Sequence, residues 1–203
     1  MARTTIWRYG EGTVDSAGTI TAISETTPTG TTTPGALGST LSVDGSGVFT
    51  LSGTSMATYN GFLSDDKKTT VGTFTDGSNY KLMVMQITGK TYTTGNMPDR
   101  VSYLHALACG IAASTSPVPF WLHYTATGSS GVWTASDWVS SSTYVTNPGT
   151  TWTATIDSTG KVTINANATY HGQVSDDKTF LVGTETTTST HGDYIYLLTV
   201  NTW

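Results

Sequence analysis

Acidic side chains occur as adjacent pairs at two places in the chain, Asp65-Asp66 and Asp176-Asp177, each preceded by a serine and followed by a lysine. Paired carboxylates could coordinate Ca²⁺, because this ion prefers several oxygen ligands from one loop. A calcium loop usually carries three or more oxygen-bearing side chains at alternating positions, whereas here Lys67 or Lys178 offsets the charge at once. The pattern therefore favours a turn, and we predict no metal site and no cofactor.

Side chains that could act as nucleophiles or general acids do not form a recognisable catalytic pattern. No G-x-S-x-G stretch occurs, and the four histidines lack zinc-type spacing. A glycosidase needs two carboxylates across a cleft, and nothing pairs Glu11, Glu25 or Glu185 in the sequence. The single cysteine, Cys109, lies among apolar residues, as is typical of a buried thiol. We predict no catalytic residues.

The strongest candidates for ligand binding are aromatic side chains in the second half of the chain: Trp121, Tyr124, Trp133, Trp138 and Tyr144. Aromatic faces stack on sugar rings, and neighbouring Thr, Asn and Asp side chains could hydrogen-bond the sugar hydroxyls. The competing interpretation is that these rings fill a small β core, since each aromatic side chain buries a large area. The choice depends on the strands that carry the rings.

The sequence around these residues is written twice. ATYNGFLSDDKKTTVGT at 57–73 and ATYHGQVSDDKTFLVGT at 168–184 are identical at eleven of seventeen positions, with an offset of 111. Two further pairs of segments match at an offset of 113: 40–51 with 153–164, and 15–22 with 128–135. We therefore predict two copies of one unit of roughly 85 residues. Trp133, Trp138 and Trp152 have no aromatic counterpart in the first copy, which favours a surface role specific to the second.

Within each copy the pattern is that of strands. Apolar and polar residues alternate in VFTLS, LMVMQI and YIYLLTV, and D-x-x-G or SDDK stretches separate these runs. We predict an all-β fold in which two homologous antiparallel meanders form small barrels or a sandwich. Gly61 and Gly172 interrupt strand-like runs, which predicts a bulge or a barrel corner where a Cβ would clash.

We expect three segments: a β repeat unit over 1–88, a second over 118–203, and residues 89–117 between them. Four apolar residues between 101 and 111 could form one face of a short helix. Alternatively, TYTTG and SYLHALACG could be the opening strands of the second unit, and this is the alternative we favour. The first unit would then lack its opening strands.

Composition narrows the possible partners. Only 11% of the 203 residues are charged, while Thr supplies 44 residues and Gly 22. The net charge of −5, with nine Lys and Arg, argues against nucleic acid, whose phosphates need a clustered basic patch. The sequence contains no apolar stretch of about 18 residues, so we predict no helix that spans a membrane. The start MARTTIWRYG does not resemble a signal peptide, and we expect a mature extracellular or cell-envelope segment with an added Met.

The order of motifs resembles a known kind of domain. A strand at SYLHALACG is followed by FW, a D-x-x-G hairpin, G-x-x-S-D-D-K and V-G-T. This order is similar to that of the tandem β-rich repeat domains of uncharacterised bacterial envelope or secreted proteins, and the likeness covers most of the chain. The resemblance implies an extracytoplasmic, non-catalytic module, and it carries over no catalytic residues.

Three functions compete. The leading hypothesis is a non-catalytic secreted or cell-surface β-repeat module for binding or assembly, with carbohydrate as the leading ligand and other surface proteins as alternative partners. Exposed strand edges would allow it to form oligomers. The second hypothesis is a barrel that carries a small apolar ligand in its interior. The third is a glycan-active hydrolase, which would need a pair of carboxylates that the sequence does not nominate.

Overall fold

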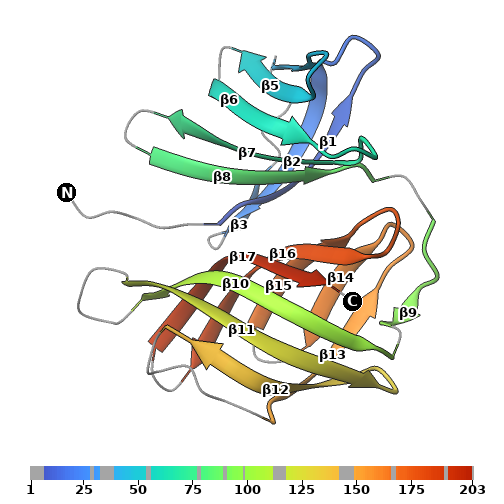
Figure 1. Ribbon diagram of the computed structural model, residues 1–203, viewed down its shortest axis with the longest axis vertical. Coiled ribbons are helices and arrows are strands. Elements are labelled where there is room, and N and C mark those ends of the chain that lie inside the picture. Colours follow the sequence, from blue (N-terminus) through green and yellow to red (C-terminus); the bar gives the residue numbers. More distant parts are fainter. Residues whose placement is uncertain are drawn as a thin grey trace. The chain divides into compact units, whose positions relative to one another are not determined.

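Strands make up the regular secondary structure throughout the described part of the chain. The computed structural model describes residues 7–27, 30–32, 39–53, 56–76, 79–88, 91–97, 99–111, 118–141, 149–165, 168–189 and 192–202. Their strands form three antiparallel sheets (Figure 1). The prediction of an all-β fold is therefore confirmed. Within these residues there is no helix long and apolar enough to cross a membrane.

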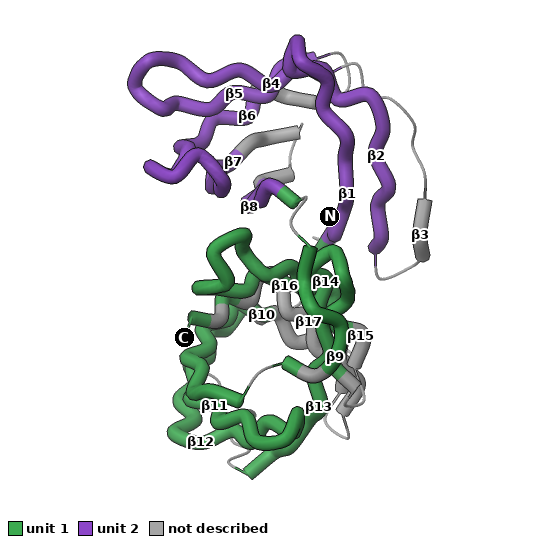
Figure 2. The backbone as a smooth tube through the Cα atoms, turned by 90° about the vertical axis from the view of Figure 1, so that its right-hand side faces the viewer, with its two compact units in different colours: residues 1–7, 88–203 green, residues 8–87 purple. Residues whose placement is uncertain are grey.

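The strands divide into two compact units (Figure 2). Residues 8–87 form the first, here named the N-terminal unit. Residues 1–7 and 88–203 form the second, named the ring unit for the arrangement of its strands. The interior of the ring unit holds most of the predicted aromatic residues, so its strands decide how the candidate site is built.

Eight strands of the ring unit close on themselves. They are β10 (Val101–Ile111), β11 (Val118–Ser129), β12 (Val132–Ser140), β13 (Thr151–Ile156), β14 (Lys161–Asn165), β15 (Ala168–Val174), β16 (Phe180–Ser189) and β17 (Gly192–Thr202). Each pairs antiparallel with the next along the chain, and β17 pairs with β10, so the series of pairings returns to its start (Figure 2). A ring of eight strands is just wide enough to be filled by side chains or to hold one small ligand.

Side chains alternate between the interior of the ring and its outer face. Along β10 the buried residues are Ser102, Leu104, Ala106 and Ala108, and the residues between them are exposed. On β12, Trp133 and Ala135 are buried in the same way. A bulge follows, at which the pairing with β11 shifts register and Asp137 takes a φ of +50°. The extra residue turns Trp138 inward, where it packs against a buried cluster that includes Leu122.

The segment before β10 is extended rather than helical. Residues 95–96 form a short strand, β9 (Gly95–Asn96), that pairs with β13 at Thr155 and Ile156. The alternative of a helix after residue 99 is wrong, because β10 continues as a strand over its full length. Its alternating side chains bury a small-residue face inside the ring, and that packing overrides the helical spacing of its apolar residues.

The N-terminal unit is a second meander. Its strands are β1 (Tyr9–Val14), β2 (Ile20–Thr27), β3 (Gly30–Thr32), β4 (Thr40–Val43), β5 (Val48–Gly53), β6 (Met56–Leu63), β7 (Thr69–Asp76) and β8 (Asn79–Gln86). The first three form one sheet and the other five another. A single bridge between Thr19 and Thr40 links the two sheets. Ile20, Phe49, Leu51 and Tyr59 form its buried core.

The two SDDK stretches form matching turns, as predicted. The Ser175 hydroxyl donates to the Asp177 carboxylate over 2.6 Å and accepts the backbone N–H groups of Thr179 and Phe180. The Ser64 hydroxyl likewise donates to the Asp66 carboxylate and accepts the backbone N–H groups of Lys68 and Thr69. Lys67 and Lys178 both adopt φ near +60°. Asp66 and Asp177, the second residue of each acidic pair, therefore help to close the hairpins.

Gly61 and Gly172 each lie beneath a tyrosine ring. Gly172 pairs with Gly183 across β15 and β16, and a Cβ on either glycine would overlap the ring of Tyr170. Gly61 lies in the same way beneath Tyr59, whose hydroxyl would be 2.7 Å from an added Cβ. The predicted clash is confirmed, but the predicted bulge is wrong, because pairing between β6 and β7 and between β15 and β16 is regular at both glycines. The missing side chains make room for an aromatic ring inside the sheet.

Candidate ligand-binding site inside the strand ring

The structure separates the predicted aromatic residues into two groups. Tyr124, Trp133 and Trp138 lie on the interior side of the ring, where Trp133 is 4% exposed. Trp121 points outward and is 52% exposed. Tyr144 lies outside the described residues. Trp133 and Trp138 therefore do not share a surface with Trp121, and an exposed patch cannot include all of them.

Three interior aromatic side chains contact one another. The rings of Tyr124 and Trp138 are stacked, with centroids 4.5 Å apart and planes within 9°. The ring of Trp152 meets that of Tyr124 edge-on, with centroids 5.6 Å apart. In the sequence, Trp152 is distinguished only because the first copy has no aromatic residue at the matching position. These rings come from three neighbouring strands, β11, β12 and β13. They form one aromatic wall of the ring interior.

A small cavity of about 40 Å³ remains between this wall and the opposite strands. It is lined by Met97, Ser102, Leu104, Tyr124, Ala126, Trp133, Trp152, Ala154, Val162, Ile164, Tyr170, Leu181 and Glu185. A cavity needs about 10–15 Å³ to hold one water molecule, so this space can take a few waters or a small organic group. Its lining is apolar and aromatic apart from a few polar groups, as is typical of small-molecule sites.

Among the described lining residues, Glu185 alone carries a carboxyl or basic side chain. It keeps some accessible surface because it faces the cavity, yet burial raises the pKa of its carboxyl from 4.5 to about 7. Within the described residues it makes no ion pair and no hydrogen bond. An ionised carboxylate in such surroundings costs free energy unless a partner compensates it. Glu185 is therefore the chemically distinctive group of the cavity.

The predicted repeat aligns Glu185 with a residue of another type. At the offset of 111 that aligns the two SDDK stretches, residue 74 of the N-terminal unit is a phenylalanine. The offset of 113 likewise aligns Trp133 with Ile20 and Trp152 with Ser39. The predicted repeat therefore aligns Glu185 and the two tryptophans with residues of other types in the N-terminal unit. This difference between the copies is the sequence signal that could have identified Glu185.

Trp133 contributes an unsatisfied donor to the same site. Its ring lies over Gly128, where an added Cβ would come within 2.9 Å of it. Its indole N–H is buried and has no hydrogen-bond partner among the described residues. Buried polar groups are nearly always paired, so an unpaired N–H at a cavity points to an occupant such as water or a ligand oxygen.

The described residues 92–97 and 99–100 run along one end of the ring. The Tyr92 hydroxyl donates to the backbone carbonyls of Val174 and Ser175, at 3.2 and 3.0 Å. The Met97 N–H donates to the Ala154 carbonyl, and the Arg100 carbonyl accepts the N–H of Gly128. This segment, here named the strap, brings the Met97 side chain to the cavity. It therefore limits the size of the space on that side.

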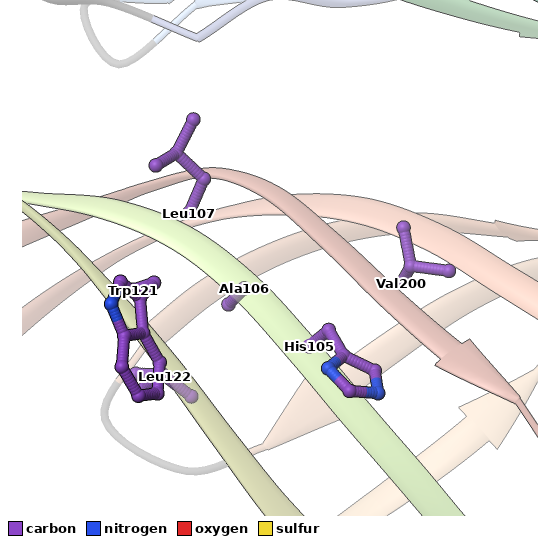
Figure 3. A pocket seen from close by; sticks show the side chains of 6 residues that line it. All are labelled: His105, Ala106, Leu107, Trp121, Leu122 and Val200. Carbon is purple, nitrogen blue, oxygen red and sulfur yellow. The ribbon is translucent and has the colours of Figure 1, made fainter. Parts of the chain in front are cut away.

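A second hollow lies on the outer face of β10 and β11 (Figure 3). It is open, measures about 360 Å³, and is lined by His105, Ala106, Leu107, Trp121, Leu122 and Val200. Leu107 is 43% exposed there. His105 and His123 are cross-strand partners beside it, with ring centroids 4.5 Å apart. The surface is apolar, and of the described residues predicted from the sequence to bind a ligand it displays only Trp121.

Metal chemistry finds no support in the described ranges, where no three His, Cys, Asp or Glu side chains come together. Comparison of the chain with known protein families, curated proteins and solved structures gave no match.

Proposed function

We propose that the ring unit is a non-catalytic binding module that takes a small molecule into its interior, at the cavity around Glu185. One observation carries the proposal: a carboxyl without an ionic partner among the described residues lines an otherwise aromatic and apolar cavity. Ionisable groups with perturbed pKa values cluster at functional sites, and a cleft that holds one is a candidate site. The phenylalanine at the matching position 74 supports the same view, because the fold tolerates an apolar residue there.

The size of the cavity limits the ligand. A drug-sized molecule needs about 300–1,000 Å³, whereas about 40 Å³ is open here. The ligand is therefore a molecule of a few heavy atoms, or a longer one that inserts a small head group. The strap would allow a longer ligand to insert its head group, because Met97 lies against the cavity on a segment outside the eight-stranded ring. The unbranched side chain of methionine adapts readily to a new neighbour.

Ligand screening on the full chain tests this proposal. Small fragments would be screened by the shift of the thermal midpoint and by the indole N–H signals in NMR spectra. Glu185→Phe, which introduces the residue found at position 74, should abolish both the thermal shift and the changes in the indole signals. Glu185→Leu replaces it as the test variant if the larger phenylalanine ring overpacks the interior. Phe62→Ala, at a position 70% exposed in the N-terminal unit, is the control and should bind as the unaltered chain does. Fragments that bind all four proteins equally would place the site elsewhere.

A second candidate function is surface recognition at the outer hollow. The exposed face of Trp121 could stack on a sugar or on an apolar side chain of a partner protein. Trp138, stacked on Tyr124 in the interior, is not the residue to test for this role. Trp121→Ala should remove any signal on a glycan array without altering the circular dichroism spectrum. A signal that survives this change would rule out the hollow.

We also propose that the protein is located outside the cytoplasm. The low content of charged residues and the abundance of Thr and Gly support it, as does the resemblance to bacterial envelope repeats. Fractionation of the source cells, followed by detection with an antibody against this chain, tests it directly. Recovery only in the cytoplasmic fraction would contradict it.

A further inference from the structure

The cavity of the ring unit combines aromatic rings and a carboxyl in a way that suggests the charge of its ligand. Four aromatic side chains line it, namely Tyr124, Trp133, Trp152 and Tyr170. Among the described residues of the lining, the Glu185 carboxyl is the only ionisable group that can carry charge near neutral pH. Aromatic faces attract cations through the negative charge above the ring plane, and a carboxylate adds direct attraction.

We propose that this cavity selects a small organic cation, an ammonium or methylated ammonium group, held between the aromatic rings and the Glu185 carboxylate. The inference rests on the proposed function, since it names the ligand class of the same cavity. The described lining contains no lysine, arginine or histidine that would compete for the carboxylate.

The strand register places aromatic residues on two walls of the cavity and the carboxyl on one of them. Trp133 and Trp152 are cross-strand partners on β12 and β13. Tyr170 and Glu185 are cross-strand partners on β15 and β16, with β14 between the two pairs. A cation in the cavity would therefore lie between the two tryptophans on one side and Glu185, with Tyr170 beside it, on the other.

The paired glycines fix one of these walls. Gly172 and Gly183 lie beneath the Tyr170 ring, so this ring rests against the sheet beside Glu185. Tyr170 is 4% exposed, and side chains on neighbouring strands hold it in place. A rigid ring beside a carboxylate loses little conformational entropy when a cation binds.

Cavity size selects among cations. The open volume of about 40 Å³ suits ammonium and methylammonium, and larger heads need the strap to move. An inorganic cation would leave the aromatic walls unused and would need oxygen ligands that the lining lacks beyond Glu185, Ser102 and two tyrosines. An organic ammonium uses both the rings and the carboxylate.

The test compares cations with neutral molecules of the same size. The ¹⁵N-labelled full chain would be titrated at pH 8 with methylammonium and with methanol, and then with tetramethylammonium and with tert-butanol. We expect saturable shifts of the Trp133 and Trp152 indole N–H signals with methylammonium, and binding of methanol weaker by about tenfold or more. Glu185→Gln should remove the preference for the cation, whereas Glu25→Gln, the same charge change in the N-terminal unit, should preserve it.

The outcomes separate the two proposals. Equal binding of methylammonium and methanol would overturn the cation inference and leave a binding cavity in place. Failure of the four probes and of the fragment screen to shift any interior signal would overturn both. Because the cation and the neutral probe are compared on the unaltered chain, the result stands even if Glu185→Gln does not fold.

Discussion

Tyr170 and Glu185 are directly opposite each other on β15 and β16, and both line the interior cavity of the ring unit. The tyrosine fills the space above a pair of glycines, whereas the carboxyl makes no ion pair or hydrogen bond with the described residues. Tyr170 therefore stabilises the ring unit, whereas the buried Glu185 carboxyl lowers its stability. The predictions below test this division.

The pH dependence of stability should reveal the cost of burying Glu185. Burial raises the pKa of its carboxyl from 4.5 to about 7, so between these values the folded chain holds a proton that the unfolded chain has lost. The free energy of unfolding should therefore fall as pH rises from 4.5 to 7, by roughly 3 kcal/mol from this group.

Urea denaturation of the unaltered chain and of Glu185→Gln isolates that effect from other titrating groups. The two should be similar in stability near pH 4, and the variant should be the more stable at pH 8. A constant difference between them across this range would show that Glu185 titrates normally.

Gly172→Ala should destabilise the ring unit by roughly 2–3 kcal/mol, because the new methyl group overlaps the Tyr170 ring. The loss should be much smaller in a chain that already carries Tyr170→Leu, as a double-mutant cycle in urea would measure. Gly45→Ala is the control, since a Cβ there meets nothing within 4 Å. Additive effects of the two interior changes would contradict the proposed overlap.

Asp177→Ala should lower the free energy of unfolding by about 1 kcal/mol at pH 7. Hydrogen bonds from the Ser175 hydroxyl, and then from the hydroxyl and N–H of Thr179, hold the pKa of the Asp177 carboxyl below 3.8. Its contribution is complete above pH 3.8 and disappears as pH falls through the lower folded value. The variant and the unaltered chain should therefore converge in stability as acid denaturation passes through that lower folded pKa. Asp65→Ala, in the exposed part of the matching turn, is the control.

Local features of this fold could be predicted from the sequence. The turns at the SDDK stretches follow from side chains that bond to their own backbone, and the strands follow from alternation. The clash at Gly172 could be predicted from its place in a strand, but its cause could not, because Tyr170 reaches it across the pleat of the same strand.

The candidate site depended on relationships that one strand does not reveal. Alternation alone places Trp138 on the opposite face from Trp133, and the bulge at Asp137 reverses this. Closure of the ring brings Glu185 near Trp152, although the two come from strands that are not neighbours. A glutamate in a Thr-rich stretch is typical of a surface, so its burial became evident only from the pairing with Tyr170.

The most direct test of the account is the titration of the Glu185 carboxyl itself. The chain contains only three glutamates, so ¹³C-labelling of glutamate gives three side-chain carboxyl signals, and Glu11 and Glu25 supply the reference signals from the N-terminal unit. In the free protein, the account predicts a pKa of about 7 for Glu185. Saturating methylammonium should lower that pKa by about one pH unit or more. A midpoint near 4.5 in the free protein, or one that methylammonium leaves unchanged, would contradict the claim that Glu185 is a buried ligand-binding carboxyl.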